Sequence, residues 1–280
     1  ALVSIMLSTA TAQVANHVVI SEVFYLAPTT APNTEFVELY NPTGSDIALT
    51  NLSLQTEIVV NSSNAGSWHV NLGGSIIKAY GYLLVGQSAV SPAPDLPIPA
   101  GKGLNNSGPR AAVRIINTVT SAVVDLVAWD GANTLGLEGT AYTAAGFTSS
   151  NPKSIERKAK SSSTSSSMHD ADSLLGNGYD SNDNSLDFVL HDAPYPQNSL
   201  SAIEQPFTGP DTEAPTVLAL QQLSATSILV QFNEAVDSAT ASTASNYVLN
   251  GGVTVNAAAR SGAQPSRVTL TTGTMAPGVY

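Results

Sequence analysis

The chain has 280 residues, of which 42% are hydrophobic and 11% charged; this is enough apolar material for a core, but well under the roughly 25% charge usual in soluble domains. The 21 acidic residues outnumber the 10 basic ones, and the net charge of −11 disfavours nucleic acid as the primary partner, because phosphate binding needs a cationic face. No cysteine is present, which excludes disulfides, thiolate metal sites and a cysteine nucleophile.

Residues 1–15 are predicted to be the remnant of a secretory signal peptide. The stretch Ala1–Ala12 is uncharged, first apolar and then small, and it ends in the Ala-x-Ala pattern of a cleavage site. It is shorter than the about 20 apolar residues that cross a bilayer, so no transmembrane segment is predicted. A buried N-terminal strand or helix is the alternative. We therefore expect a secreted protein, extracellular or at a cell surface.

Residues 16–204 carry short segments rich in β-branched and aromatic residues, each bounded by Gly, Pro, Asn or Ser. None keeps the i, i+3, i+4, i+7 apolar spacing of a helix over three turns. Many short strands at steady spacing predict an all-β sandwich or barrel. The predicted strands include residues 18–24, 34–40, 47–54, 67–72, 80–85, 111–116 and 122–129.

Residues 34–42 combine aromatic and aliphatic bulk with two carboxylates. The apolar side chains predict a buried strand, and Glu35 and Glu38 are expected at its rim. Pro42 should stop the strand, because proline has no N–H for the ladder. Tyr40 is expected to bury its ring while its hydroxyl finds a polar partner.

The composition changes after residue 150, where four of the ten basic residues fall at Lys153, Arg157, Lys158 and Lys160. We interpret this run as the solvated end of a strand. Contact with an anionic polymer, such as cell-wall glycan or extracellular DNA, is the alternative, but the net negative field opposes it. The serine-rich tract at 161–167 is predicted to be an exposed, mobile loop.

Residues 205–212, in a stretch with prolines and a glycine, are predicted to be an interdomain linker. Residues 213–280 then resume the strand pattern. They are fewer than the roughly 100 residues of a complete Ig-like sandwich, so we expect a truncated second sandwich with exposed sheet edges and low stability. The last residues stop within a strand-like pattern, which suggests a fragment of a longer protein.

The motifs of common enzyme classes are missing from the sequence. It has no HExxH, no Gly-x-Ser-x-Gly and no phosphate-binding glycine loop. A zinc site needs three or four convergent ligands, and the histidines form no close pair along the chain. We predict no catalytic residues here and assign the histidines to surface or loop positions: His17, His69, His169 and His191.

One acidic segment places side-chain oxygens at alternate positions, as Ca²⁺ prefers. It is not an EF-hand, because Ser185 replaces the glycine at loop position 6 and His191 replaces the bidentate glutamate. A solvated loop of Asx turns is the favoured interpretation, and a Ca²⁺ site is the alternative hypothesis. No other cofactor is expected. The candidate ligands are Asp180, Asn182, Asp183 and Asp187.

Several segments resemble a known family. Residues 20–23, 34–42 and 47–52 are similar to the opening of a lamin-tail domain, and later segments fit the bacterial secreted version. The resemblance covers about residues 16–200 and implies an immunoglobulin-like β-sandwich with long loops. Residues 213–280 are similar to the S-layer-type Ig-like modules of bacteria. The later lamin-tail segments are 81–85, 124–129, 154–157, 183–188 and 194–199.

These observations together predict a non-catalytic, two-module bacterial protein that acts in adhesion, as a scaffold or as a spacer. A rigid sandwich suits this role because it holds recognition loops away from a surface. The expected partners are other cell-surface proteins or glycans. One alternative is a set of accessory domains for a secreted nuclease or phosphoesterase whose catalytic domain lies outside this sequence. The other is a calcium-dependent carbohydrate-binding module.

Overall fold

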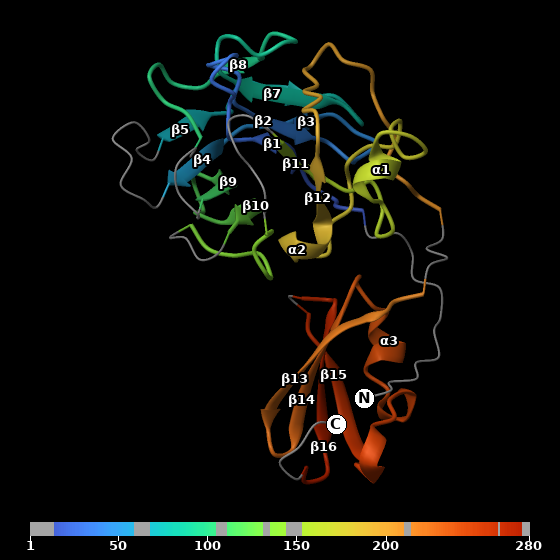
Figure 1. Ribbon diagram of the computed structural model, residues 1–280. Coiled ribbons are helices and arrows are strands. Elements are labelled where there is room, and N and C mark those ends of the chain that lie inside the picture. Colours follow the sequence, from blue (N-terminus) through green and yellow to red (C-terminus); the bar gives the residue numbers. More distant parts are fainter. Residues whose placement is uncertain are drawn as a thin grey trace.

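The computed structural model of the chain describes residues 14–58, 68–104, 111–130, 135–143, 153–209, 214–262 and 264–275. The predicted signal-peptide remnant lies outside the described residues except for Val14 and Ala15, and so do residues 210–212 of the predicted linker. Two β modules follow one another along the chain (Figure 1). Within the described ranges, no helix has both the length and the apolar character needed to cross a membrane.

The described residues of the N-terminal module form twelve strands and two short helices. A six-stranded sheet has the order β12-β11-β1-β2-β7-β8 and a four-stranded sheet the order β10-β9-β4-β5, while β3 pairs with β6. All pairs are antiparallel except β7–β8. The prediction of an all-β, Ig-like sandwich is therefore confirmed. The elements are β1 (Val19–Phe24), β2 (Phe36–Tyr40), β3 (Ile47–Ala48), β4 (Leu52–Ile58), β5 (Trp68–Asn71), β6 (Ile76–Ile77), β7 (Tyr82–Gly86), β8 (Leu96–Pro97), β9 (Ala111–Asn117), β10 (Val123–Trp129), β11 (Ser154–Arg157), α1 (Ser165–Met168), α2 (Asn184–Asp187) and β12 (Phe188–His191).

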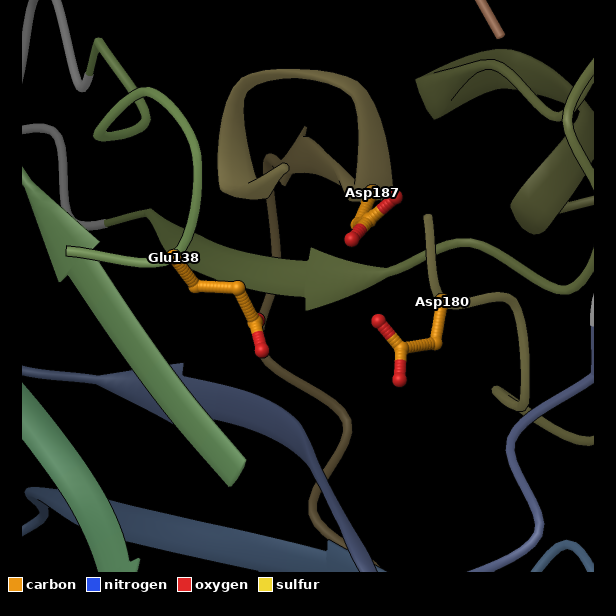
Figure 2. A group of neighbouring side chains, drawn as sticks. All are labelled: Glu138, Asp180 and Asp187. Atoms are coloured by element: carbon orange, nitrogen blue, oxygen red, sulfur yellow. The ribbon is translucent and has the colours of Figure 1, made fainter. Parts of the chain in front are cut away.

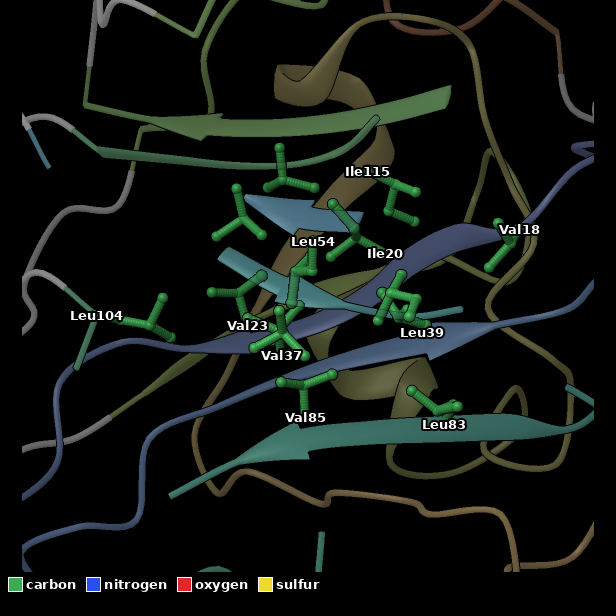
Figure 3. Close-up of a cluster of buried hydrophobic side chains, with 14 of the residues drawn as sticks. Val18, Ile20, Val23, Val37, Leu39, Leu54, Leu83, Val85, Leu104 and Ile115 are labelled. Atoms are coloured by element: carbon green, nitrogen blue, oxygen red, sulfur yellow. The ribbon is translucent and has the colours of Figure 1, made fainter. Parts of the chain in front are cut away.

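The main core lies between the two sheets (Figure 3). Because side chains alternate along a strand, Val37 and Leu39 of β2 point toward Leu54 of β4 and Ile115 of β9, and all four are fully buried. Burial of one such side chain contributes about 1.5–3 kcal/mol. The indole of Trp129 closes one side of the core by stacking on Tyr25, with ring centroids 4.7 Å apart.

The opposite face of the six-stranded sheet is also covered, by residues 193–205, which we call the strap. Its backbone crosses the sheet, so that Tyr195 N–H donates to Glu22 (3.3 Å) and Gln197 N–H to Glu38 (2.5 Å). The expectation that Glu35 and Glu38 lie at a rim is wrong, because they are only 3% and 2% exposed. The strap explains the burial of Glu38, since it covers the face that would otherwise meet solvent.

At its end, the strap packs closely against Tyr40 and Gly176. The Tyr40 hydroxyl donates to the carbonyl of Glu204, and Gly176 N–H donates to the carbonyl of Gln205 (3.0 Å). A Cβ at position 176 would lie 1.9 Å from the Tyr40 hydroxyl oxygen, so only glycine fits there. The strap is therefore part of the folded module.

The basic run and the serine-rich tract both differ from the sequence-based predictions. Arg157 is fully buried rather than solvated. The tract forms α1, and a capping box links Thr164 with Ser167, because Ser and Thr hydroxyls supply the bonds that a helix start lacks. Ser163 is 3% exposed and donates to Asp172. Side-chain hydroxyls thus organise a segment whose polarity predicted an exposed, mobile loop.

The described part of the C-terminal module is one four-stranded sheet of order β13-β14-β16-β15. One face packs against short helices around Val230, Phe232 and Val268. The edge strand β13 is exposed at all eight positions, which agrees with the expected open sheet edge. The described residues of this module thus contain one sheet and three short helices. The elements are β13 (Val217–Ser224), β14 (Ser227–Phe232), α3 (Ser238–Ala241), η1 (Ala244–Asn246), η2 (Asn250–Gly252), β15 (Val255–Arg260) and β16 (Arg267–Thr272).

Candidate metal centre

Three carboxylates from separate segments converge near α2 (Figure 2). Glu138 follows β10, Asp180 precedes α2 and Asp187 is the last residue of α2. One oxygen of each lies within 4.8 Å of the others. Two oxygens bound to the same Ca²⁺ are at most about 5 Å apart, because each Ca²⁺–O distance is roughly 2.3–2.6 Å. The three oxygens are therefore close enough to share one cation.

Local hydrogen bonds fix the position of each carboxylate. Asp187 Oδ1 accepts from the backbone N–H and the hydroxyl of Ser181, at 2.9 and 2.5 Å. Asp180 Oδ1 accepts from Asn182 N–H at 3.0 Å, which makes an Asx turn. Glu138 Oε2 accepts from the amide side chain of Asn184 at 3.0 Å. The cluster is therefore held by side chains and turns rather than by mutual contact of the acids.

A buried arginine lies beside the cluster and joins three parts of the fold. Arg157 Nη2 donates to both oxygens of Asp125, at 3.0 and 2.9 Å. Its Nε donates to the carbonyl of Ile20 (2.9 Å) and its Nη1 to that of Tyr179 (3.1 Å). The guanidinium carbon also lies 4.6 Å from the ring centroid of Phe188, a cation–π contact. Arg157 and Asp125 are both at most 1% exposed.

Four carboxylates surround the single guanidinium of Arg157. Arg157 Nη1 lies 3.7 Å from Asp180 and 3.9 Å from Asp187, while Asp125 and Glu138 complete a group of four carboxylates. Burial and the nearby Asp180 raise the pKa of Asp187 to about 8. Burial and the charge of Asp125 hold the pKa of Glu138 well above its usual range. At neutral pH the cluster therefore retains protons, which a divalent cation would displace.

The cluster contains two of the four ligands predicted from the sequence, Asp180 and Asp187. Asn182 is exposed, and Asp183 instead caps α2 by accepting from Ser185 N–H at 3.2 Å. Glu138 was not predicted, because it lies far upstream and no local motif distinguishes it. The loop has the Asx turns of the favoured interpretation, but the expectation that it is solvated is wrong, because Asp180, Asp183 and Asp187 are at most 5% exposed.

The predicted surface or loop position is wrong for His191, which is buried in β12 and stacks on His169. The rings of His169 and His191 lie 3.7 Å apart with 12° between their planes. His191 Nε2 lies 3.4 Å from Glu156 Oε2. Burial and the neighbouring His169 lower the pKa of His191 to about 4, so this ring is neutral at pH 7. Among the described residues, no three-ligand group forms around this pair.

A second row of acids lies beneath the strap. Glu22 of β1 is opposite Glu156 of β11 on one side and Glu38 of β2 on the other. Burial raises the pKa of Glu22 to about 7 and that of Glu156 to about 8. Burial and the charge of Glu22 hold the pKa of Glu38 well above its usual range. Hydroxyl and backbone N–H donors already bind Glu22 and Glu38, so the row joins the strap to the sheet.

An open hollow of about 870 Å³ lies beside Glu35 and the segment 97–104. Glu35 Oε2 accepts from Leu104 N–H at 2.5 Å, and the side-chain amide of Gln87 donates to the carbonyl of Lys102 at 3.0 Å. Its lining includes no histidine. Glu35, Ser88 and Lys102 line it instead, and Glu35 Oε2 and the Lys102 carbonyl already accept hydrogen bonds from the protein.

Comparison with known proteins bears on the N-terminal module. The family model of the Lamin Tail Domain matches residues 11–192, from before β1 to just past the end of β12. A search of curated proteins finds no match. The match covers more than half of the chain and includes all three carboxylates of the cluster.

Proposed function

Because the chain belongs to the lamin tail domain family, whose members are non-catalytic Ig-like domains, we propose that it is a secreted or cell-surface structural module. In this proposal it serves adhesion or spacing between surface components, and its partners are surface glycans or proteins. The observation that carries the proposal is the arrangement of two β modules in series, with a strap after β12 that packs on the first of them. The low charge content and the absence of cysteine are compatible with this role.

The use of the buried polar groups supports a structural role. Arg157, Glu22 and Glu38 are at most 3% exposed and bind strands, turns or the strap. Groups that hold a fold together are poorly placed to reach a substrate. Recognition therefore falls to the loops that connect the strands, as in other sandwiches.

Binding of the purified chain to peptidoglycan sacculi and to a panel of cell-surface polysaccharides tests the proposal. We expect saturable retention on at least one of these surfaces and no hydrolysis of a phosphodiester such as bis(p-nitrophenyl) phosphate. Hydrolysis by the chain would contradict the proposal. The full-length gene tests the accessory-domain alternative, because further Ig-like repeats favour adhesion and a downstream hydrolase domain favours the alternative.

We also propose that Glu138, Asp180 and Asp187 bind a divalent cation of the Ca²⁺ type. The convergence of three carboxylate oxygens within 4.8 Å supports this, together with the excess of acids over the single guanidinium of Arg157. The cation would replace the protons that the cluster holds and would tie the 138 segment to α2. Loss of glycan binding on chelation would favour the calcium-dependent carbohydrate-binding alternative.

Titration with CaCl₂ tests the cation proposal. At 100 times the dissociation constant, Ca²⁺ is expected to stabilise the folded chain by about 2.7 kcal/mol, which raises the melting temperature by several degrees. Since the pKa of Asp187 is about 8, binding should release protons at pH 7 and tighten as the pH rises to 8. Calorimetry in buffers of different ionisation enthalpy measures that release.

The E138Q and D187N variants should lose this response. D46N provides a matched control, because Asp46 is a surface acid paired with Lys78 at 2.8 Å, away from the cluster. The response of D46N should equal that of the parent chain. Absence of both a binding heat and a thermal shift at millimolar Ca²⁺ would eliminate the site.

A further inference from the structure

We propose that Arg267 of the C-terminal module docks on Thr140 and Asp183 of the sandwich and thereby holds the two modules in one fixed arrangement. This inference concerns the joint between the modules and does not depend on a bound cation. The joint lies at the end of the sandwich where α2 faces the C-terminal sheet (Figure 1).

The contact across the joint is direct. Arg267 Nη2 donates to Thr140 Oγ1 at 2.5 Å and lies 3.6 Å from Asp183 Oδ2. Thr140 and Asp183 are themselves connected, because Thr140 N–H donates to Asp183 Oδ1 at 3.1 Å. The sandwich thus presents a hydroxyl and a carboxylate together, at a spacing that one guanidinium can span.

One oxygen of the Asp183 carboxylate lacks a hydrogen-bond donor within the described part of the sandwich. Asp183 is fully buried, and its Oδ2 accepts no hydrogen bond. A buried carboxylate oxygen without a donor is costly unless a cation lies nearby. The guanidinium of Arg267, 3.6 Å away, supplies that charge. Asp180 and Asp187 also lie near α2, so a cationic side chain suits this end of the sandwich.

The arginine is held in place within its own module. Its Nε donates to the side-chain oxygen of Gln231, and its Nη1 donates to that of Gln264 at 2.8 Å. Two of its donor groups are thus fixed to the C-terminal module while the third faces Thr140 and Asp183. Because its guanidinium is bonded to both modules, Arg267 can fix the orientation of one module relative to the other as well as the distance between them.

Other contacts lie along the same joint. The backbone N–H of Ala235 is 3.5 Å from the hydroxyl oxygen of Tyr179, and Glu234 acts electrostatically on Lys158. These contacts are long or indirect. Modules joined by a small polar interface ordinarily move relative to one another, so the fixed arrangement depends mainly on Arg267.

Pulsed electron–electron resonance on the full chain tests the joint. Since the chain has no cysteine, a V119C/V248C background carries one spin label in each module, at positions that are 72% and 58% exposed. We expect one narrow distance distribution in this background. R267Q and D183N should broaden it by roughly twofold or more, as expected for modules that move freely.

R260Q is the matched control, because Arg260 Nε donates to the carbonyl of Val236 within the same module and should leave the width unchanged. D183N keeps the cap of α2, since asparagine is as good a helix cap as aspartate. It therefore gives the decisive result even if R267Q unfolds the C-terminal module. A broad distribution in the background, or an unchanged width in D183N, would overturn the proposal.

Discussion

R157M is expected to lower the free energy of unfolding of the N-terminal module by about 3–5 kcal/mol. Arg157 compensates the buried carboxylate of Asp125 and donates to the carbonyls of Ile20 and Tyr179. Methionine fills similar space but leaves that carboxylate with only the backbone N–H of Ile20 as a donor among the described residues, and it removes the Arg157 donors from both carbonyls. Urea unfolding followed by near-UV circular dichroism measures the loss as a lower midpoint at unchanged slope.

Two further variants separate the loss of the buried ion pair from the effect of removing any basic residue. K153M removes a basic residue of the same run, whose partner Asp192 is exposed, and it should change stability little because exposed ion pairs contribute little. R157M combined with D125N should be less destabilised than the sum of the single changes. An equal decrease in the free energy of unfolding for R157M and K153M would contradict the role given to Arg157.

The stability of the N-terminal module is expected to fall as the pH rises from about 6.5 to 9. The pKa of Glu22 is raised to about 7 and that of Glu156 to about 8, from an ordinary 4.5. The folded state therefore binds more protons than the unfolded state over this range. For each extra proton that it binds, the free energy of unfolding falls by up to about 1.4 kcal/mol per pH unit. The stabilisation is complete below pH 4.5 and is lost as the pH passes 7 to 8.

The pH window matters because groups whose pKa is lowered by burial act in the opposite sense, His191 at the acidic end and Lys158 toward the alkaline end. His191, with its pKa lowered to about 4, makes stability rise with pH up to its ordinary value near 6.5, so the measurement begins above that point. Melting temperatures recorded in EDTA give the slope without cations. E22Q keeps an oxygen acceptor for the strap but carries no charge, and it should make the slope shallower, while Glu156 and Asp187 maintain the remainder. A flat or rising profile in the parent chain would contradict the prediction.

The strands were predictable because their signals are local. Residues 34–40 are rich in aromatic and aliphatic side chains and precede Pro42, and β2 ends at Tyr40, two residues before that proline. The prediction that Tyr40 buries its ring and finds a partner for its hydroxyl is likewise confirmed, by the bond to Glu204. Side-chain period and turn residues act over a few positions, so a single sequence reveals them.

The positions of the buried charges were not predictable in the same way. Glu38 alternates with apolar residues like any edge acid, and the strap that covers it lies more than 150 residues later in the chain. Arg157 resembles its exposed basic neighbours in sequence but points inward to Asp125 of β10. Glu138 joins Asp180 and Asp187 only through tertiary folding. Contacts between residues that are distant in sequence determine whether these side chains are buried. The residues next to them in the sequence do not indicate those contacts.

The strap also determines how a pull on the C-terminal module would reach the sandwich. Once the contact of Arg267 with Thr140 and Asp183 has broken, tension along the chain would meet the bond between Gly176 and Gln205, then that between Glu204 N–H and Tyr80. Next would come the anchors at Gln197 and Tyr195, and only afterwards the ladder of β12. The chain would thus lengthen in small successive steps, each dissipating work, while both sheets stayed closed around their core.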